Sequence, residues 1–278
     1  MQNTSSRAVG IRLLIPLVSL LVLLGLSCSK IPVQAATPVE EPILFGFFDR
    51  GGNRLLSLGP TDAVFDWTEP QVVFATNQQR AALYDMLQQK SPASNNRHTA
   101  RNFDRLAGHR LIVTGTGPSN QSALLVNSTF FADRSLAELA EIDAENNAAD
   151  RQRIELLRRR PLQQNWLLLQ TTIGIRLQLV LFQPIGDQAL AALALILPDR
   201  ILWRDFPASY NPTSTWRVDD DGRIGPQQFR ILYLGQRQQQ WELAYEFIGA
   251  EGSLLEFIRE QQNRFESVSK ASRYMAPL

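Results

Sequence analysis

The sequence has very little cysteine and histidine: Cys28 is the single cysteine, and His98 and His109 are the two histidines. A single cysteine excludes an intramolecular disulfide, and these three residues are too few for a four-ligand Cys/His zinc site. A charge excess is also lacking, since 28 lysine and arginine residues stand against 27 aspartate and glutamate residues. That balance does not indicate nucleic-acid binding. No motif indicates a metal or a cofactor.

The composition is otherwise that of a folded protein. Hydrophobic residues make up 44% of the 278 residues, and charged residues make up 20%. These proportions exclude an intrinsically disordered chain and a membrane protein with many spans.

The N-terminal segment has the layout of a secretory signal. Arg7 and Arg12 precede an apolar block at residues 13–26, and no acidic residue lies before the block. A helix of that length rises only about 21 Å, which is short of the roughly 30 Å hydrocarbon core of a bilayer. The segment is therefore typical of a signal peptide rather than of a spanning helix.

Cys28 follows the apolar block directly, in the sequence LGLSC at residues 24–28. Here the chain resembles the signal of bacterial lipoproteins, in which the cysteine is lipidated and becomes the new N-terminus. The resemblance implies a signal peptide at residues 1–27 and a lipid on Cys28, followed by an extended, proline-containing tether through residues 28–42. Two alternatives stay open: cleavage after residues 33–35, which would release a soluble periplasmic or secreted protein, and an uncleaved anchor.

The rest of the chain, residues 43–278, is expected to form a single α+β domain. Its predicted core is a large curved antiparallel β-sheet or partial barrel packed by helices, because successive strands are joined by short turns. Two lobes are possible, at residues 43–131 and 166–278, joined by a helix at residues 135–160. Strands are expected at residues 43–48, 54–58, 64–67, 71–75, 110–114, 122–131, 173–182, 189–197, 201–203, 213–218, 228–234 and 240–248, with 110–114 pairing with 122–131.

Three further helices are predicted from capping residues and apolar spacing. Thr76 and Gln79 resemble a capping box that opens a helix to residue 89, with Leu83, Met86 and Leu87 as its buried stripe. A second helix is expected at residues 96–107, and a third begins at residue 253, with Leu254, Ile258 and Phe265 on one face.

Arg97, Arg101 and Arg105 are the best-defined polar feature of the sequence. On the predicted helix at residues 96–107, their spacing of four places them within about 80° of one another. Guanidinium groups in line can bind phosphate or carboxylate in a bidentate manner, so these residues form a candidate anion-binding site. The alternative is a solvated helix face that is partly neutralised by Asp104.

Aromatic residues on two neighbouring strands form a second candidate site, a pocket for an apolar ligand. The simpler interpretation is that they belong to the core. The residues are Trp241, Tyr245, Phe247, Phe229 and Tyr233.

Glu242 and Glu246 lie on the opposite face of the same predicted strand. Their spacing sets them about 13 Å apart, too far for a glycosidase pair without an acid from another strand. We expect them to be exposed surface carboxylates.

These observations predict an exported lipoprotein of the bacterial cell envelope, attached to a membrane through a lipid anchor. We expect it to act as a binding or assembly module without catalytic residues, a metal or a cofactor. Its expected partners are the membrane and either an envelope protein or an apolar or anionic ligand, with no nucleic acid. The alternative is a carboxylate-dependent hydrolase that cleaves envelope glycans.

Overall fold

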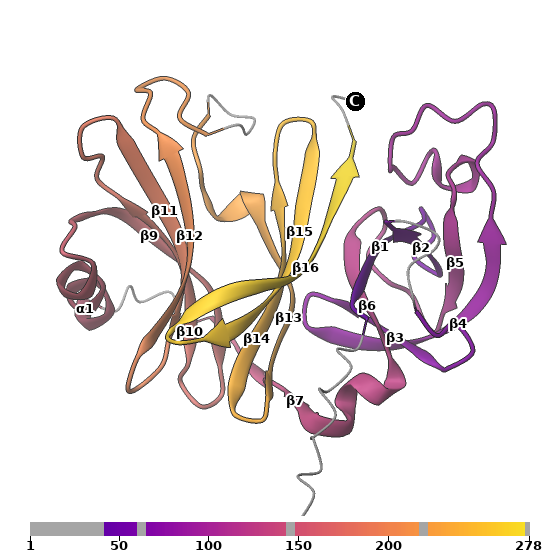
Figure 1. Ribbon diagram of the computed structural model, residues 1–278, viewed down its shortest axis with the longest axis horizontal. Coiled ribbons are helices and arrows are strands. Elements are labelled where there is room, and N and C mark those ends of the chain that lie inside the picture. Colours follow the sequence, from indigo (N-terminus) through magenta and orange to yellow (C-terminus); the bar gives the residue numbers. More distant parts are fainter. Residues whose placement is uncertain (1–41, 60–64, 143–147, 217–221, 276–278) are drawn as a thin grey trace, which may run out of the picture. The chain divides into compact units, whose positions relative to one another are not determined.

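A closed barrel of six antiparallel strands forms the first part of the fold (Figure 1). The computed structural model describes residues 42–59, 65–142, 148–216 and 222–275, so the predicted signal peptide and Cys28 lie outside the described residues. The strands are β1 (Leu44–Phe48), β2 (Arg54–Leu58), β3 (Gln71–Ala75), β4 (Gln78–Gln88), β5 (Gly108–Val113) and β6 (Ser122–Asn127). Around the barrel they follow the order β1-β2-β5-β4-β3-β6.

The second part is a sheet of ten strands that curls into a half-barrel (Figure 1). Its strands are β7 (Arg134–Leu136), β8 (Leu139–Ala140), β9 (Leu162–Thr171), β10 (Arg176–Phe182), β11 (Gln188–Ile196), β12 (Ile201–Ser209), β13 (Phe229–Arg237), β14 (Gln240–Ile248), β15 (Gly252–Gln261) and β16 (Arg264–Tyr274). Pairing is antiparallel, apart from one parallel bridge between Trp203 and Arg264. The order β7-β13-β14-β15-β16-β12-β11-β10-β9-β8 begins and ends on strands that are close together in the chain.

Helical structure is sparse in the described residues. The α-helix α1 (Ala148–Arg158) buries Ile154 against apolar residues of the half-barrel. Three short 3-10 turns are η1 (Phe103–Arg105), η2 (Ser128–Asp133) and η3 (Pro226–Gln228). None of the helices in the described ranges has the length and hydropathy of a membrane span. The protein is therefore mostly β, and the expected curved antiparallel sheet is present without the expected packing of several helices.

The predicted helix at residues 76–89 is wrong, because that segment forms strand β4. Thr76 and Asn77 have φ values of 51° and 56°, so they turn the chain from β3 into β4 instead of starting a helix. Two consecutive residues with positive φ are typical of a tight β-hairpin turn. Leu83, which was expected to be buried, is 64% exposed.

The other predicted helices are also wrong in whole or in part. Residues 96–107 form a loop that contains only the short turn η1, and residues 253–265 belong to β15 and β16. Of the helix at residues 135–160, only α1 is helical among the described residues, while β7 and β8 occupy its beginning.

Most predicted strands of the sheets are confirmed, with one error of pairing. The β1–β2 hairpin forms, and the apolar run at residues 189–197 is a buried strand, β11. The strands expected at residues 110–114 and 122–131 do not pair with each other: β5 pairs with β2 and β4, and β6 pairs with β1 and β3. The described parts of the segments expected as strands at 64–67 and 213–218 lie in turns and irregular structure.

A shared apolar cluster joins the barrel to the half-barrel. Phe45 and Phe47 of β1 belong to it, together with Leu255 and Phe257 of β15. Asn77 adds polar contacts: its backbone N–H donates to Leu232 O, and its side chain bonds to the backbone of β13 and of residue 137. The turn between β3 and β4 is therefore held against the half-barrel.

Candidate anion-binding site

A cavity of about 590 Å³ lies at one end of the barrel and is lined by four arginines. Arg97, Arg101 and Arg105 come from the loop between β4 and β5. The fourth, Arg50, follows β1 and was not expected from the sequence. The three predicted arginines thus lie around one cavity, although the helix on which the prediction rested does not form.

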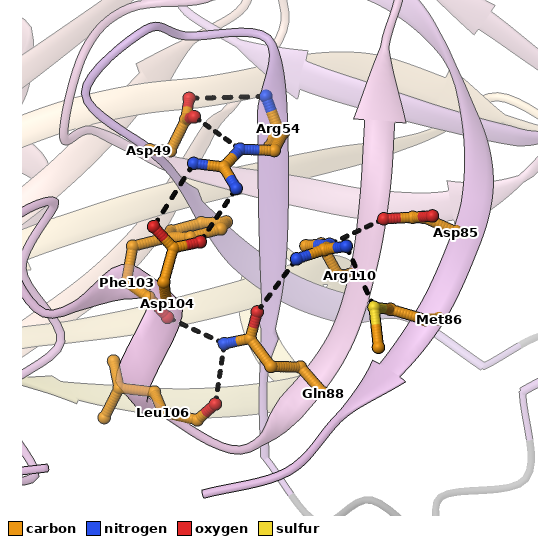
Figure 2. A network of polar contacts seen from close by, with 9 residues as sticks. All are labelled: Asp49, Arg54, Asp85, Met86, Gln88, Phe103, Asp104, Leu106 and Arg110. Atoms are coloured by element: carbon orange, nitrogen blue, oxygen red, sulfur yellow. Dashed lines mark hydrogen bonds and ion pairs between the residues drawn. The ribbon is translucent and has the colours of Figure 1, made fainter. Parts of the chain in front are cut away.

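The β4–β5 loop is fixed to the barrel by Gln88 at the end of β4 (Figure 2). The Gln88 side chain is buried, and its Nε2 donates hydrogen bonds of 2.7 Å to Phe103 O and 2.7 Å to Leu106 O. Arg110 lies beside it, with Nη1 3.5 Å from Gln88 Oε1 and Nε 2.6 Å from Asp85 Oδ2. Because both loop carbonyls are held by one buried amide, the turn that carries Arg105 has a defined position.

Arg54 of β2 holds the same loop and binds two carboxylates, those of Asp49 and Asp104 (Figure 2). Its Nε bonds to Asp49 Oδ2 at 2.8 Å, and its Nη1 bonds to Asp104 Oδ1 at 2.7 Å. The hydrogen bond with Asp49 is the main cause of the raised pKa of Arg54, so this guanidinium stays charged. Its carbon Cζ also lies 5.1 Å from the centre of the Phe103 ring, which packs on Phe47.

Arg273, near the end of β16, supports the cavity from the half-barrel side. It is 1% exposed and donates to three backbone or side-chain oxygens of Asn120 and His98 and to Ser122 Oγ. Burial lowers the pKa of Arg273 to about 10, a value at which it remains protonated at neutral pH. Asn120 itself lines the cavity and accepts a hydrogen bond from the Ala100 N–H. Arg273 therefore connects the two loops that meet at the cavity.

His98 is held by the same contacts and is kept neutral. Burial lowers its pKa, and the nearby charge of Arg273 lowers it further. Its Nδ1 accepts a hydrogen bond of 3.2 Å from the Tyr274 N–H, which is consistent with an unprotonated nitrogen. His98 thus contributes shape rather than charge to this end of the barrel.

The four arginines of the cavity have no internal partner in the described part of the chain. The side chains of Arg50, Arg97, Arg101 and Arg105 make no hydrogen bond or ion pair with described residues. Since Arg54 holds both Asp49 and Asp104, these nearby acids are not available to them. Arg54, Asp49 and Asp104 together carry about one negative charge, which is less than the four positive charges of the cavity arginines, so an anion bound among the arginines would be stabilised.

The aromatic residues of the second candidate site do not all lie together. Trp241, Tyr245 and Phe229 belong to one buried cluster of the half-barrel, and the partly buried Phe247 packs against it. Tyr233 belongs instead to the cluster shared with the barrel, and its ring centroid lies 5.2 Å from that of Phe74. A register shift between Ile231 and Tyr233 accompanies this change of side.

The expectation that Glu242 and Glu246 are exposed is wrong. Glu242 is 0% exposed and accepts from Arg134 Nε at 2.8 Å and from Arg259 Nε at 2.7 Å. Glu246 is 1% exposed and accepts from Arg230 Nη1 at 2.6 Å. They are buried because the face of β14 that carries them packs toward the barrel, where Ser122 of β6 bonds to Glu246.

These pairings bear on the alternative of a glycan hydrolase. A hydrolase acting through Glu242 and Glu246 would first have to break their ion pairs, since a general acid or base must reach its substrate directly or through one water. In this arrangement both carboxylates are engaged by arginines and are not free to act as a general acid or base. Among the described residues, no group of three or more His, Cys, Asp or Glu side chains could hold a metal ion.

Comparison with known proteins adds no assignment to this geometry. No protein family, no curated protein and no solved structure matches the chain.

Proposed function

We propose that the protein is an exported, lipid-anchored protein of the bacterial cell envelope that binds an anionic ligand and catalyses no reaction. The observation that carries the proposal is the arginine cavity. Four guanidinium groups line it without a partner among the described residues, while the neighbouring carboxylates are engaged by Arg54.

The chemistry of guanidinium favours phosphate or carboxylate as the bound group. Its planar arrangement of N–H donors matches two oxygens of either anion and gives short, charge-assisted hydrogen bonds. The loop that presents Arg97, Arg101 and Arg105 is already fixed by Gln88, Arg54 and Arg273. Less conformational entropy is lost on binding when the site is formed in advance.

A titration with inorganic phosphate tests the binding proposal. The chain from Glu41 to Leu278 is suitable because it forms one compact unit. We expect calorimetry to detect phosphate binding, with an affinity that falls as the salt concentration rises. Binding should be lost when Arg97, Arg101 and Arg105 are all changed to Gln.

A matched variant controls for net charge. Arg80, Arg159 and Arg264 do not line the cavity, and changing all three to Gln removes the same charge. This control should bind phosphate as the unchanged chain does. Equal loss of binding in both variants would mean that binding depends on the net charge of the protein and not on the cavity, which would contradict the proposal.

The proposal of a lipid anchor depends on Cys28. Metabolic labelling with a fatty-acid probe should mark the full chain expressed in a bacterium, and Cys28→Ala should abolish the label. An unlabelled chain recovered in the soluble fraction would contradict the anchor and would favour release by cleavage after residues 33–35.

A further inference from the structure

The cavity is larger than a single phosphate group requires. Its volume of about 590 Å³ lies within the range of roughly 300–1,000 Å³ typical of pockets for small organic molecules. One phosphate group carries a charge of about −1.5 to −2 at neutral pH, which balances only about half of the four guanidinium charges. Both volume and charge therefore leave room for a ligand with more than one anionic group.

The arginines also approach the cavity from separate parts of the chain. Arg50 lies in the turn between β1 and β2, whereas Arg97, Arg101 and Arg105 lie in the loop between β4 and β5. A ligand with two anionic groups could thus be bound by both segments at once.

Three asparagines line the cavity together with the arginines, and each side chain is held by one end of its amide. Asn95 Oδ1 accepts from the Arg97 N–H, and Asn102 Nδ2 donates to Arg97 O at 3.0 Å. Asn120 Oδ1 accepts from Arg273 Nη2 at 2.7 Å.

The other end of each amide has no partner among the described residues. Asn95 Nδ2 and Asn120 Nδ2 are donors, and Asn102 Oδ1 is an acceptor. Oriented neutral donors and acceptors beside cationic groups are suited to hydroxyl groups, which donate and accept in the same way.

We infer that the ligand is a polyhydroxylated molecule with at least two phosphate or carboxylate groups, of the class of a multiply phosphorylated saccharide. This inference rests on the proposed function, because it names the class of anion that the same cavity takes. The arginines bind the anionic groups, and the amides of Asn95, Asn102 and Asn120 bind the hydroxyls between them.

A series of four probes tests the inference by calorimetry on the chain from Glu41 to Leu278. The probes are inorganic phosphate, fructose, fructose 6-phosphate and fructose 1,6-bisphosphate. We expect no binding of fructose, intermediate affinity for the monophosphate, and at least tenfold tighter binding of the bisphosphate than of inorganic phosphate. A tenfold gain corresponds to about 1.4 kcal/mol.

Two variants separate the contributions of charge and of the amides. Arg50→Gln should weaken bisphosphate binding more than phosphate binding, because one of the two cationic segments is removed. Asn95→Ser keeps an oxygen for the Arg97 N–H but loses the amide donor. It should therefore weaken binding of the bisphosphate by a larger factor than binding of inorganic phosphate.

The outcomes distinguish failure of the inference from failure of the proposed function. If inorganic phosphate and the bisphosphate bind with equal affinity, the cavity takes single anions and the inference is wrong while the proposed function stands. If none of the anions binds, the proposed function fails and the inference fails with it.

Discussion

Replacing Gln88 with leucine tests whether the loop over the cavity depends on one buried amide. Gln88 Nε2 donates to Phe103 O and Leu106 O, each at 2.7 Å. Leucine has a similar size and no donor, so both carbonyl oxygens would lose this partner. A buried polar group without a hydrogen bond costs about 1–3 kcal/mol.

The expected loss in the free energy of unfolding is about 2–4 kcal/mol. Two unpaired carbonyl groups would together cost about 2–6 kcal/mol. We take the lower half of this range because Phe103 O also accepts a hydrogen bond of 3.4 Å from the Leu106 N–H. For a domain of this size, each kcal/mol lowers the melting temperature by about 2–4 °C. The variant should therefore melt roughly 4–16 °C below the unchanged chain and should bind phosphate more weakly, since the turn that carries Arg105 is no longer fixed.

Gln79→Leu is the matched control, because Gln79 lies on the same strand with its side chain exposed. An exposed substitution of this kind changes stability by about 0.5 kcal/mol or less. Urea unfolding followed by circular dichroism measures both variants. If Gln88→Leu is no more destabilised than Gln79→Leu, the two hydrogen bonds do not hold the loop and the reasoning is refuted.

Two further predictions concern buried charges of the half-barrel. Arg273→Met should lower the free energy of unfolding by about 3 kcal/mol or more, because oxygens of Asn120 and His98 lose a charged donor. The same variant should bind phosphate more weakly, and Arg273→Lys should recover part of both stability and binding. Unchanged phosphate affinity in Arg273→Met would contradict a positioning role. Glu256 is expected to contribute pH-dependent stability. Burial alone would raise its pKa, but the hydrogen bond from Tyr245 and the charge of Arg204 outweigh burial and lower it. The folded pKa therefore lies below the ordinary value of 4.5, so the contribution is present above about pH 4.5 and is lost as pH falls through the folded pKa. Unfolding curves at pH 7 and pH 4 should differ less for Glu256→Gln than for the unchanged chain, and an equal difference would refute this assignment.

The sequence indicates strands well where burial is continuous and poorly where a strand is irregular. The apolar run of β11 is buried along nearly its whole length, so it is recognisable as a strand without knowledge of its neighbours. In β4, a register shift between Tyr84 and Met86 breaks the alternation of side chains. The resulting spacing of Leu83, Met86 and Leu87 imitates a helix, although the residues lie on an exposed part of the barrel.

The candidate site was only partly predictable for a related reason. Arg97, Arg101 and Arg105 are close in sequence, so their proximity in space follows in either a helix or a compact loop. Arg50 joins them only because the β1–β2 turn and the β4–β5 loop meet at one end of the barrel. That meeting depends on strand order, which local sequence patterns do not specify.

The burial of Glu242 illustrates the same limit. Its alternation with apolar residues along β14 is typical of an exposed strand face. Glu242 is nevertheless buried and forms ion pairs with Arg134 and Arg259. A second β-structure packed on that face removes both carboxylate and guanidinium groups from solvent. The pairs across strands cannot be recognised before the register is known.

The most direct test of the arginine cavity is a nuclear magnetic resonance titration that resolves single arginines. The chain from Glu41 to Leu278, labelled at the arginine Nε position, would be titrated with inorganic phosphate. The Nε–Hε signals of Arg50, Arg97, Arg101 and Arg105 should shift with one common affinity. Those of Arg54 and Arg204, which hold carboxylates, should stay in place. The account would be contradicted if the signals of the four cavity arginines did not shift, or if the signals of all arginines shifted equally.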